Sequence, residues 1–248
     1  MLLFINNIYF IICLINIINA TVVVNENDIL TNLSESNSIV TLEINSVIDI
    51  TKEIKINNSI QKLYINGNSL DLAKLNLRYP LYFESNIEEI KIKNITINGS
   101  LFFKKNNKKI TIDTVNLNGY IDSDFDYYSN NNIEIKKLNY KPKGYSVENC
   151  IYLGGNVKID NSYFLGNSFC RNRLLHYNGF KKYKFDLKES KFNGEYECPF
   201  LSIENTTIAN IESLYFEKGY SSRSIDGGYI KNILLITCYY YCYYCYWY

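Results

Sequence analysis

A ten-residue pattern recurs seven times along this chain of 248 residues and constrains its fold more than any other feature. The pattern runs apolar, any, apolar, any, polar, any, any, apolar, any, and then Gly or Asn. The clearest copies are Ile90–Gly99, Ile110–Gly119, Val157–Gly166, Phe185–Gly194 and Leu201–Asn210, and weaker copies begin at Leu63 and Ile133. Successive copies start 16 to 28 residues apart, with an average of 23. Such self-similarity indicates a repeat architecture.

Three repeat folds can be compared with this period. A β-propeller blade repeats at roughly 40 residues or more, which is too long. Ile60 to Asn68 fits the leucine-rich-repeat template, but later copies lose its first apolar position. The chain holds 35 Ile and only three Ala, a composition that favours strands over helices. We therefore expect an all-β, right-handed, single-stranded parallel β-helix of about 8–9 coils, with the leucine-rich repeat as the alternative.

The pattern has a direct meaning in such a fold. Its first and third positions point to the same side of a strand, so Ile90 and Ile92 should enter the core. The polar fifth position should turn the chain, because Asn tolerates the left-handed backbone that a tight bend requires. We expect Asn94, Asn161 and Asn205 to stack above one another as a turn ladder.

The two ends of the chain differ from the repeats. Residues 1–20 carry no charged side chain and end on the small Ala20, which indicates a signal peptide, with an uncleaved membrane anchor as the alternative. We expect an N-terminal cap over residues 21–38, including a short helix capped by Asp28, and the β-helix over residues 39–232. Residues 233–248 form an apolar tail rich in Tyr and Cys.

In a secreted protein, asparagines can be glycosylated and cysteines can form disulfides, and the sequence holds candidates for both. Asn-X-Ser/Thr sites for glycosylation occur at Asn32, Asn57, Asn94, Asn98 and Asn205. Cys170 and Cys198 each lie 13 residues after the start of a pattern copy. Equal offsets predict stacked positions about 4.8 Å apart, within reach of a disulfide, so we expect either that bridge or two stacked thiols.

Few residues point to chemistry. The net charge of +1 offers no electrostatic case for nucleic acid. Asp122, Asp124 and Asp126 alternate along a predicted strand and could hold a hard cation such as calcium, or form a solvated acidic turn. The single histidine, His176, has no partner motif and is expected to be structural.

One family resemblance can be stated on these residues. The order of a short helix, the segment IVTLEINSVIDITKEIKI and then LYINGN resembles the start of pectin-lyase-like right-handed parallel β-helix proteins. The resemblance covers roughly residues 25–232 and implies enzymes that act on acidic polysaccharides. The Asn-Thr-Asp, Asp-Asp, Gly-His-Gly and Arg-Ile-Lys strings typical of the hydrolases in that group do not occur in this chain.

The function expected is therefore that of a secreted or cell-surface β-helix protein without catalytic activity, serving as an adhesive, carbohydrate-binding or structural module. A divergent polysaccharide lyase or glycoside hydrolase is the first alternative, and a leucine-rich-repeat binding protein is the second. The expected partner is a polysaccharide or a cell-surface glycan. A membrane is expected as a partner only if one of the apolar end segments is retained.

Overall fold

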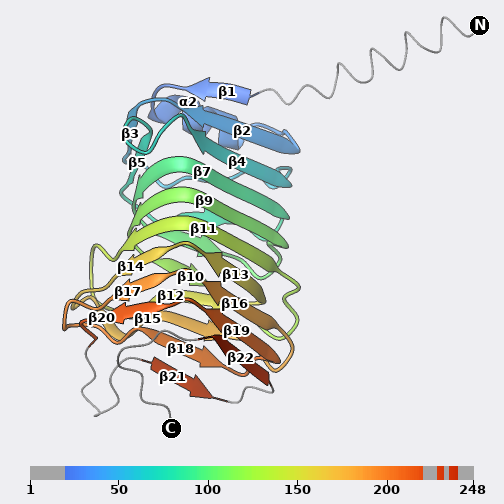
Figure 1. The fold of residues 1–248 in the computed structure, drawn as a ribbon. Helices are drawn as coiled ribbons and strands as arrows, with labels where there is room; N and C mark the ends of the chain where they lie inside the picture. Colours follow the sequence, from blue (N-terminus) through green and yellow to red (C-terminus); the bar gives the residue numbers. More distant parts are fainter. Residues whose placement is uncertain (1–19, 220–227, 232–234, 240–248) are drawn as a thin grey trace, which may run out of the picture.

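Strands from successive repeats stack in parallel into a β-solenoid of about eight turns (Figure 1). This computed structural model describes residues 20–219, 228–231 and 235–239. The prediction of a parallel β-helix is confirmed, and the leucine-rich-repeat alternative is wrong. The predicted signal peptide lies outside the described residues apart from Ala20, and the apolar tail lies outside them apart from residues 235–239.

The strands form three faces that run along the solenoid. The first face consists of β1 (Ala20–Val23), β2 (Ile39–Ile44), β4 (Lys62–Gly67), β7 (Glu89–Asn98), β9 (Lys109–Asn118), β11 (Asn132–Lys141), β13 (Asn156–Asp160), β16 (Lys184–Lys188), β19 (Ile208–Glu212) and β22 (Leu235–Tyr239). The second face consists of the far halves of β7, β9 and β11 together with β3 (Val47–Ile50), β5 (Lys74–Leu77), β14 (Tyr163–Leu165), β17 (Lys191–Asn193) and β20 (Tyr215–Glu217).

The third face is a separate sheet of seven strands. It consists of β6 (Leu81–Phe83), β8 (Leu101–Phe103), β10 (Ile121–Ser123), β12 (Val147–Gly154), β15 (Cys170–Asn178), β18 (Leu201–Glu204) and β21 (Gly228–Lys231). From β4 onward, each turn of the chain passes over the three faces in the same order, so that equivalent residues of successive turns become neighbours.

Strand register confirms six of the seven pattern copies as equivalent. Leu63, Ile90, Ile110, Ile133, Val157 and Phe185 are paired in succession along the first face. The copy at Leu201 is misplaced, because Leu201 pairs with Leu175 on the third face. The first face continues instead at Ala209, which pairs with Phe185. Apolar alternation occurs on every face, so a match to the pattern does not identify the face.

From β7 to β20, the bend between the first and second faces takes a left-handed backbone at one residue per turn. Six stacked residues there have φ between 45° and 57°: Asn94, Thr114, Lys137, Asn161, Glu189 and Ser213. Asn205 also has a positive φ, but it follows β18 at the end of the third face. The predicted ladder of Asn94, Asn161 and Asn205 is therefore wrong, because this bend selects a backbone conformation and accepts several side chains.

An amide ladder does exist, at the bend between the second and third faces. The Nδ2 of Asn76 donates to Asp49 at 2.6 Å, Asn98 donates to Asn76 at 2.6 Å, and Asn118 donates to Asn98 at 2.7 Å. Asn98 and Asn118 occupy the ninth position of the pattern, to which the sequence alone assigns no role. Lys141 follows Asn118 in register and ends the ladder.

The predicted N-terminal helix is confirmed as α2 (Glu26–Ser34). Its N-cap is Asn25 rather than Asp28: the Asn25 side chain accepts from the Asp28 N–H at 3.0 Å, and the Asp28 carboxylate accepts from the Asn25 N–H at 3.2 Å. This reciprocal pair is a capping box. Ile29 and Leu33 are buried against the first turn, so the helix covers apolar core at that end of the solenoid. No helix among the described residues has the length and hydropathy needed to cross a membrane.

The core changes character along the solenoid. In the column that the eighth pattern position supplies, aliphatic side chains fill the early turns and aromatic rings stack axially in the later ones. Phe164 and Phe192 are stacked with their ring centroids 4.6 Å apart, and Phe192 and Phe216 follow at 5.2 Å. These residues continue the column of Ile97 and Leu117, which the eighth position of the pattern supplies. Ile208 holds the eighth position of the misplaced copy. It lies on the first face beside Ala209, which takes the inward position, and Ile208 is therefore only half-buried.

The predicted bridge between Cys170 and Cys198 is wrong. The structure joins Cys150 to Cys170, with their Cα atoms 5.3 Å apart. Cys198 is a buried free thiol whose Sγ donates to the Pro199 carbonyl at 3.2 Å. The prediction counted residues from the start of each pattern copy and assumed that the same count reaches the same place in every turn. The register of β12 against β15 shifts between Val147 and Asn149, so this assumption fails there. That shift makes offsets from the first face unreliable on the third.

Candidate functional site

The outward side chains of the third face form an axial column with a high aromatic content. Along β6, β8 and β10, Leu81, Leu101 and Ile121 point inward, so the residue after each of them points outward. In order along the solenoid, the outward column is Tyr82, Phe102, Asp122, Tyr152, His176 and Ser202. This column runs parallel to the solenoid axis.

A groove of about 440 Å³ lies over the first four members of this column. Its aromatic lining residues are Tyr82, Phe102, Tyr120, Tyr145 and Tyr152, and its charged ones are Asp122 and Glu148. Among the described residues that line it, none is Lys or Arg. Concave sites with aromatic walls and a few placed polar groups are the usual form of small-ligand and glycan sites.

The aromatic rings of the groove are held by their neighbours and by one hydrogen bond. The rings of Tyr82 and Phe102 have centroids 5.3 Å apart with a tilt of 42°. The Tyr120 hydroxyl donates to the Tyr145 carbonyl, and the two rings are 5.4 Å apart. Burial raises the pKa of Tyr120 and outweighs the hydrogen bond to the Tyr145 backbone, which lowers it. Tyr120 therefore stays a neutral donor that fixes the loop carrying Tyr145.

The two carboxylates of the groove are exposed and lack ion-pair partners among the described residues. One oxygen of Asp122 accepts from the Ser123 N–H at 2.8 Å. A cation in the same region is Lys104, whose Nζ lies 4.9 Å from the Phe102 ring centroid. That ammonium pairs with Asp124 at 3.5 Å. The described lining of the groove therefore carries two carboxylates and no Lys or Arg, while the Lys104 ammonium lies beside it over the Phe102 ring.

His176 extends the column beyond the groove. Its ring is stacked on Tyr152, with centroids 5.3 Å apart and an angle of 18° between planes. Burial lowers the pKa of His176, and the nearby Glu204 opposes this shift while Arg173 adds to it. The imidazole is therefore mainly neutral at pH 7 and supports the Tyr152 ring. Burial also raises the pKa of Tyr152, with Asp122 and Glu204 contributing.

The predicted calcium site is not formed. Asp122 lies in the groove, whereas Asp124 pairs with Lys104. Asp126 accepts from the N–H groups of Tyr128 and Ser129, each at 2.9 Å, and so caps a turn. Among the described residues no three His, Cys, Asp or Glu side chains gather in a way that could hold a metal ion. Alternation predicts all three Asp on one side of a strand, but β10 ends at Ser123 and Asp126 begins a turn that closes at Ser129.

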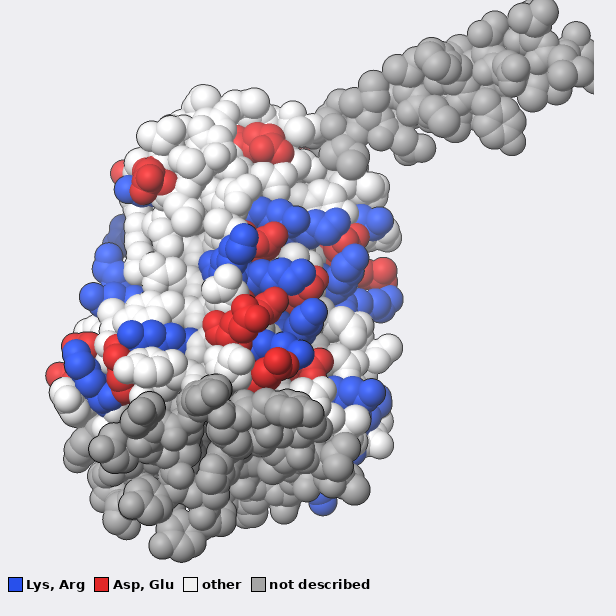
Figure 2. Space-filling model, viewed as in Figure 1, with Lys and Arg blue, Asp and Glu red and all other residues white. Residues whose placement is uncertain are grey.

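The first face is charged but internally neutralised. Figure 2 shows acidic and basic side chains interspersed over the strands of this face. One register column reads Lys93, Asp113, Lys136, Asp160, Lys188 and Glu212, with charge signs that alternate at each turn. Lys188 pairs with Glu212 at 2.7 Å. A shallow depression of about 270 Å³ on this face is lined by both signs of charge, so it offers no clear ligand preference.

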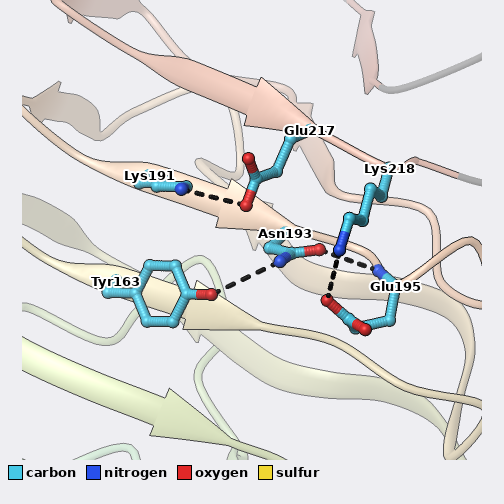
Figure 3. A network of polar contacts seen from close by, with 6 residues as sticks. All are labelled: Tyr163, Lys191, Asn193, Glu195, Glu217 and Lys218. Carbon is cyan, nitrogen blue, oxygen red and sulfur yellow. Dashed lines mark hydrogen bonds and ion pairs between the residues drawn. The ribbon is translucent and has the colours of Figure 1, made fainter.

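The second face carries a polar network near its C-terminal end (Figure 3). Lys191 pairs with Glu217 at 2.9 Å, and Lys218 pairs with Glu195 at 3.4 Å. The Nδ2 of Asn193 donates to the Tyr163 hydroxyl at 3.4 Å. The Lys191 ammonium also lies over the tyrosine rings on either side of it in register. These groups satisfy one another across successive turns, so the network is structural.

The five glycosylation sequons differ in accessibility. Asn94 is exposed at a bend, whereas Asn32, Asn57, Asn98 and Asn205 are half-buried. Asn98 takes part in the amide ladder on both sides. Asn57 donates to the Ser34 carbonyl at 2.8 Å, and Asn32 donates to the Asp28 carbonyl at 2.7 Å. Asn94 is thus the sequon best placed to accept a glycan.

Comparison with known proteins adds no relative. A scan against protein-family models, a search of curated proteins and a search of solved structures each returned no match. The site must therefore be interpreted from its own geometry.

Proposed function

We propose that the protein is a secreted or cell-surface carbohydrate-binding module without catalytic activity, and that it binds glycan in the groove of the third face. We further propose that its solenoid is right-handed and of the pectin-lyase-like kind. The single observation that carries the proposal is the aromatic groove of about 440 Å³, which follows the solenoid axis over successive turns. An axial column of this kind suits an extended polymer, because three of its four turns present a ring and the fourth presents the Asp122 carboxylate.

Three observations support this proposal. The half-exposed rings of Tyr82, Phe102 and Tyr152 offer flat apolar surfaces for the apolar faces of sugar rings. The Cys150–Cys170 disulfide fits an oxidising compartment, as secretion requires. Residues 1–20 fit a signal peptide.

A double variant, Tyr82→Ala with Phe102→Ala, tests the site. Wild-type and variant protein are titrated by calorimetry with the oligosaccharides that a glycan array identifies. Loss of two stacking contacts should weaken binding about tenfold or more. Tyr128→Ala removes a ring that is 84% exposed outside the groove and should leave binding unchanged. Equal affinities of the double variant and the wild type would contradict the proposal.

The enzymatic alternative is tested on the same samples. Acidic and neutral polysaccharides are incubated with the protein, with and without calcium, and the products are examined for new reducing ends and unsaturated sugars. We expect no release above that of a heat-denatured control. Calcium-dependent release of unsaturated products would show a lyase and overturn the non-catalytic part of the proposal.

A further inference from the structure

The charge of the third-face groove is opposite to the charge needed for an acidic polysaccharide. Asp122 and Glu148 line it, and none of its described lining residues is Lys or Arg. A polyuronate would bring its carboxylates close to Asp122 and Glu148, and the Lys104 ammonium beside the groove is already paired with Asp124. The groove therefore selects against the ligand class that the family resemblance implies.

The same lining is complementary to a sugar that carries positive charge. Aromatic faces attract cations through the ring quadrupole, and a carboxylate beside the ring adds a charged acceptor. The groove offers both at neighbouring positions of one column, because Tyr152 follows Asp122 in register, whereas the Lys104 ammonium already lies over the Phe102 ring. This protein already uses such contacts internally: the ammonium of Lys191 lies 5.0 Å from the Tyr215 ring centroid and pairs with Glu217.

We propose that the ligand of this groove is an amino-sugar polymer with free, protonated amino groups, such as β-1,4-linked glucosamine. The inference rests on the proposed function, since it names the class of glycan. Sugar rings stack along Tyr82, Phe102 and Tyr152, and ammonium groups approach Asp122 and Glu148. A basic peptide would also meet the charge requirement, but the flat rings repeated from turn to turn favour a polymer of flat units over a peptide.

The test compares three pentamers of equal length at about pH 5.5, at which glucosamine carries its proton. They are the β-1,4-linked pentamers of glucosamine and of N-acetylglucosamine, and the pentamer of galacturonic acid. Calorimetry of the full chain should show that the glucosamine pentamer binds at least tenfold more tightly than the other two. Raising NaCl from about 0.05 to 0.5 M should weaken only that binding, because salt screens exposed charges.

The variant Asp122→Asn with Glu148→Gln removes the charge and keeps the shape. The amide introduced at position 122 keeps an oxygen for the Ser123 N–H, so the fold should survive, which circular dichroism verifies. We expect the glucosamine preference to disappear while weak binding of N-acetylglucosamine persists. The control variant Asp113→Asn with Glu134→Gln makes the same charge change on the first face and should keep the preference.

The outcomes separate the inference from the proposed function. Equal binding of the glucosamine and N-acetylglucosamine pentamers would overturn the amino-sugar inference and leave carbohydrate binding intact. Tighter binding of the galacturonic acid pentamer, or of a lysine pentapeptide, would also overturn it. Binding of no oligosaccharide, neutral, acidic or basic, would overturn both.

Discussion

Amide side chains at the bend between the second and third faces are hydrogen-bonded to the equivalent side chain one turn away. In the amide ladder, Asn98 donates to Asn76 and accepts from Asn118, so this amide uses both its donor and its acceptor. The paired strands that carry these residues hold the amides of successive turns at hydrogen-bonding distance. The ladder thus links the register of neighbouring turns to the identity of one residue per turn.

The variant Asn98→Ala should destabilise the fold by about 1–2 kcal/mol, because it removes two hydrogen bonds of the half-buried ladder at once. Urea denaturation followed by circular dichroism gives the free energy of unfolding. Asn130→Ala, at an exposed position, serves as the control and should stay within about 0.5 kcal/mol of the wild type. A variant at Asn98 as stable as the control would show that the ladder contributes nothing.

The cysteines make a second prediction at the scale of single residues. Burial raises the pKa of the Cys198 thiol to about 12. At about pH 8, roughly four pH units lower, about one thiol in ten thousand is ionised, and the thiolate is the reactive form. Iodoacetamide should therefore leave Cys198 unlabelled in the native protein and label it after denaturation. Peptide mapping without reductant should find Cys150 joined to Cys170; a Cys170–Cys198 peptide would contradict the structure.

At the scale of elements, the sequence predicts strands better than it predicts which face they occupy. The alternation in Ile90–Ile92 and in Phe185–Leu187 identifies buried strand residues correctly. It cannot distinguish β18 from a first-face strand, since both show the same alternation. The connections between faces vary in length, and only hydrogen-bond register resolves which residues become neighbours. That is why the strands are predictable while the disulfide partner and the Asn column are not.

The axial stack of aromatic rings gives the prediction for elements. Phe192 is fully buried between Phe164 and Phe216, which belong to β14 and β20. Phe192→Ala should cost about 3–5 kcal/mol, because it leaves a cavity that the flanking strands cannot close. Phe192→Leu should cost clearly less. Urea denaturation measures both, with Tyr128→Ala as a surface control; similar costs for the Ala and Leu variants would contradict an ordered stack.

On the scale of the whole molecule, the three faces differ in whether their charged and polar side chains are paired with one another. The first face pairs its charges along the solenoid, and the second pairs its polar groups near the C-terminal end. The third face presents exposed carboxylates and half-exposed rings. The column of Tyr82, Phe102, Asp122 and Tyr152 that lines the groove comes from four successive strands of this face: β6, β8, β10 and β12. The outward residues of LYF, LFF and IDS carry a signal in the sequence, but only the stacking of turns reveals that they form one groove.

Hydroxyl-radical footprinting of tyrosines, read by mass spectrometry, tests most directly whether glycan binds the third face. The protein is oxidised with and without a saturating oligosaccharide. We predict protection of Tyr82, Tyr145 and Tyr152 in the groove, and unchanged oxidation of Tyr128 and Tyr196, which are exposed elsewhere. Protection at Tyr128 and Tyr196 with none in the groove would contradict the account.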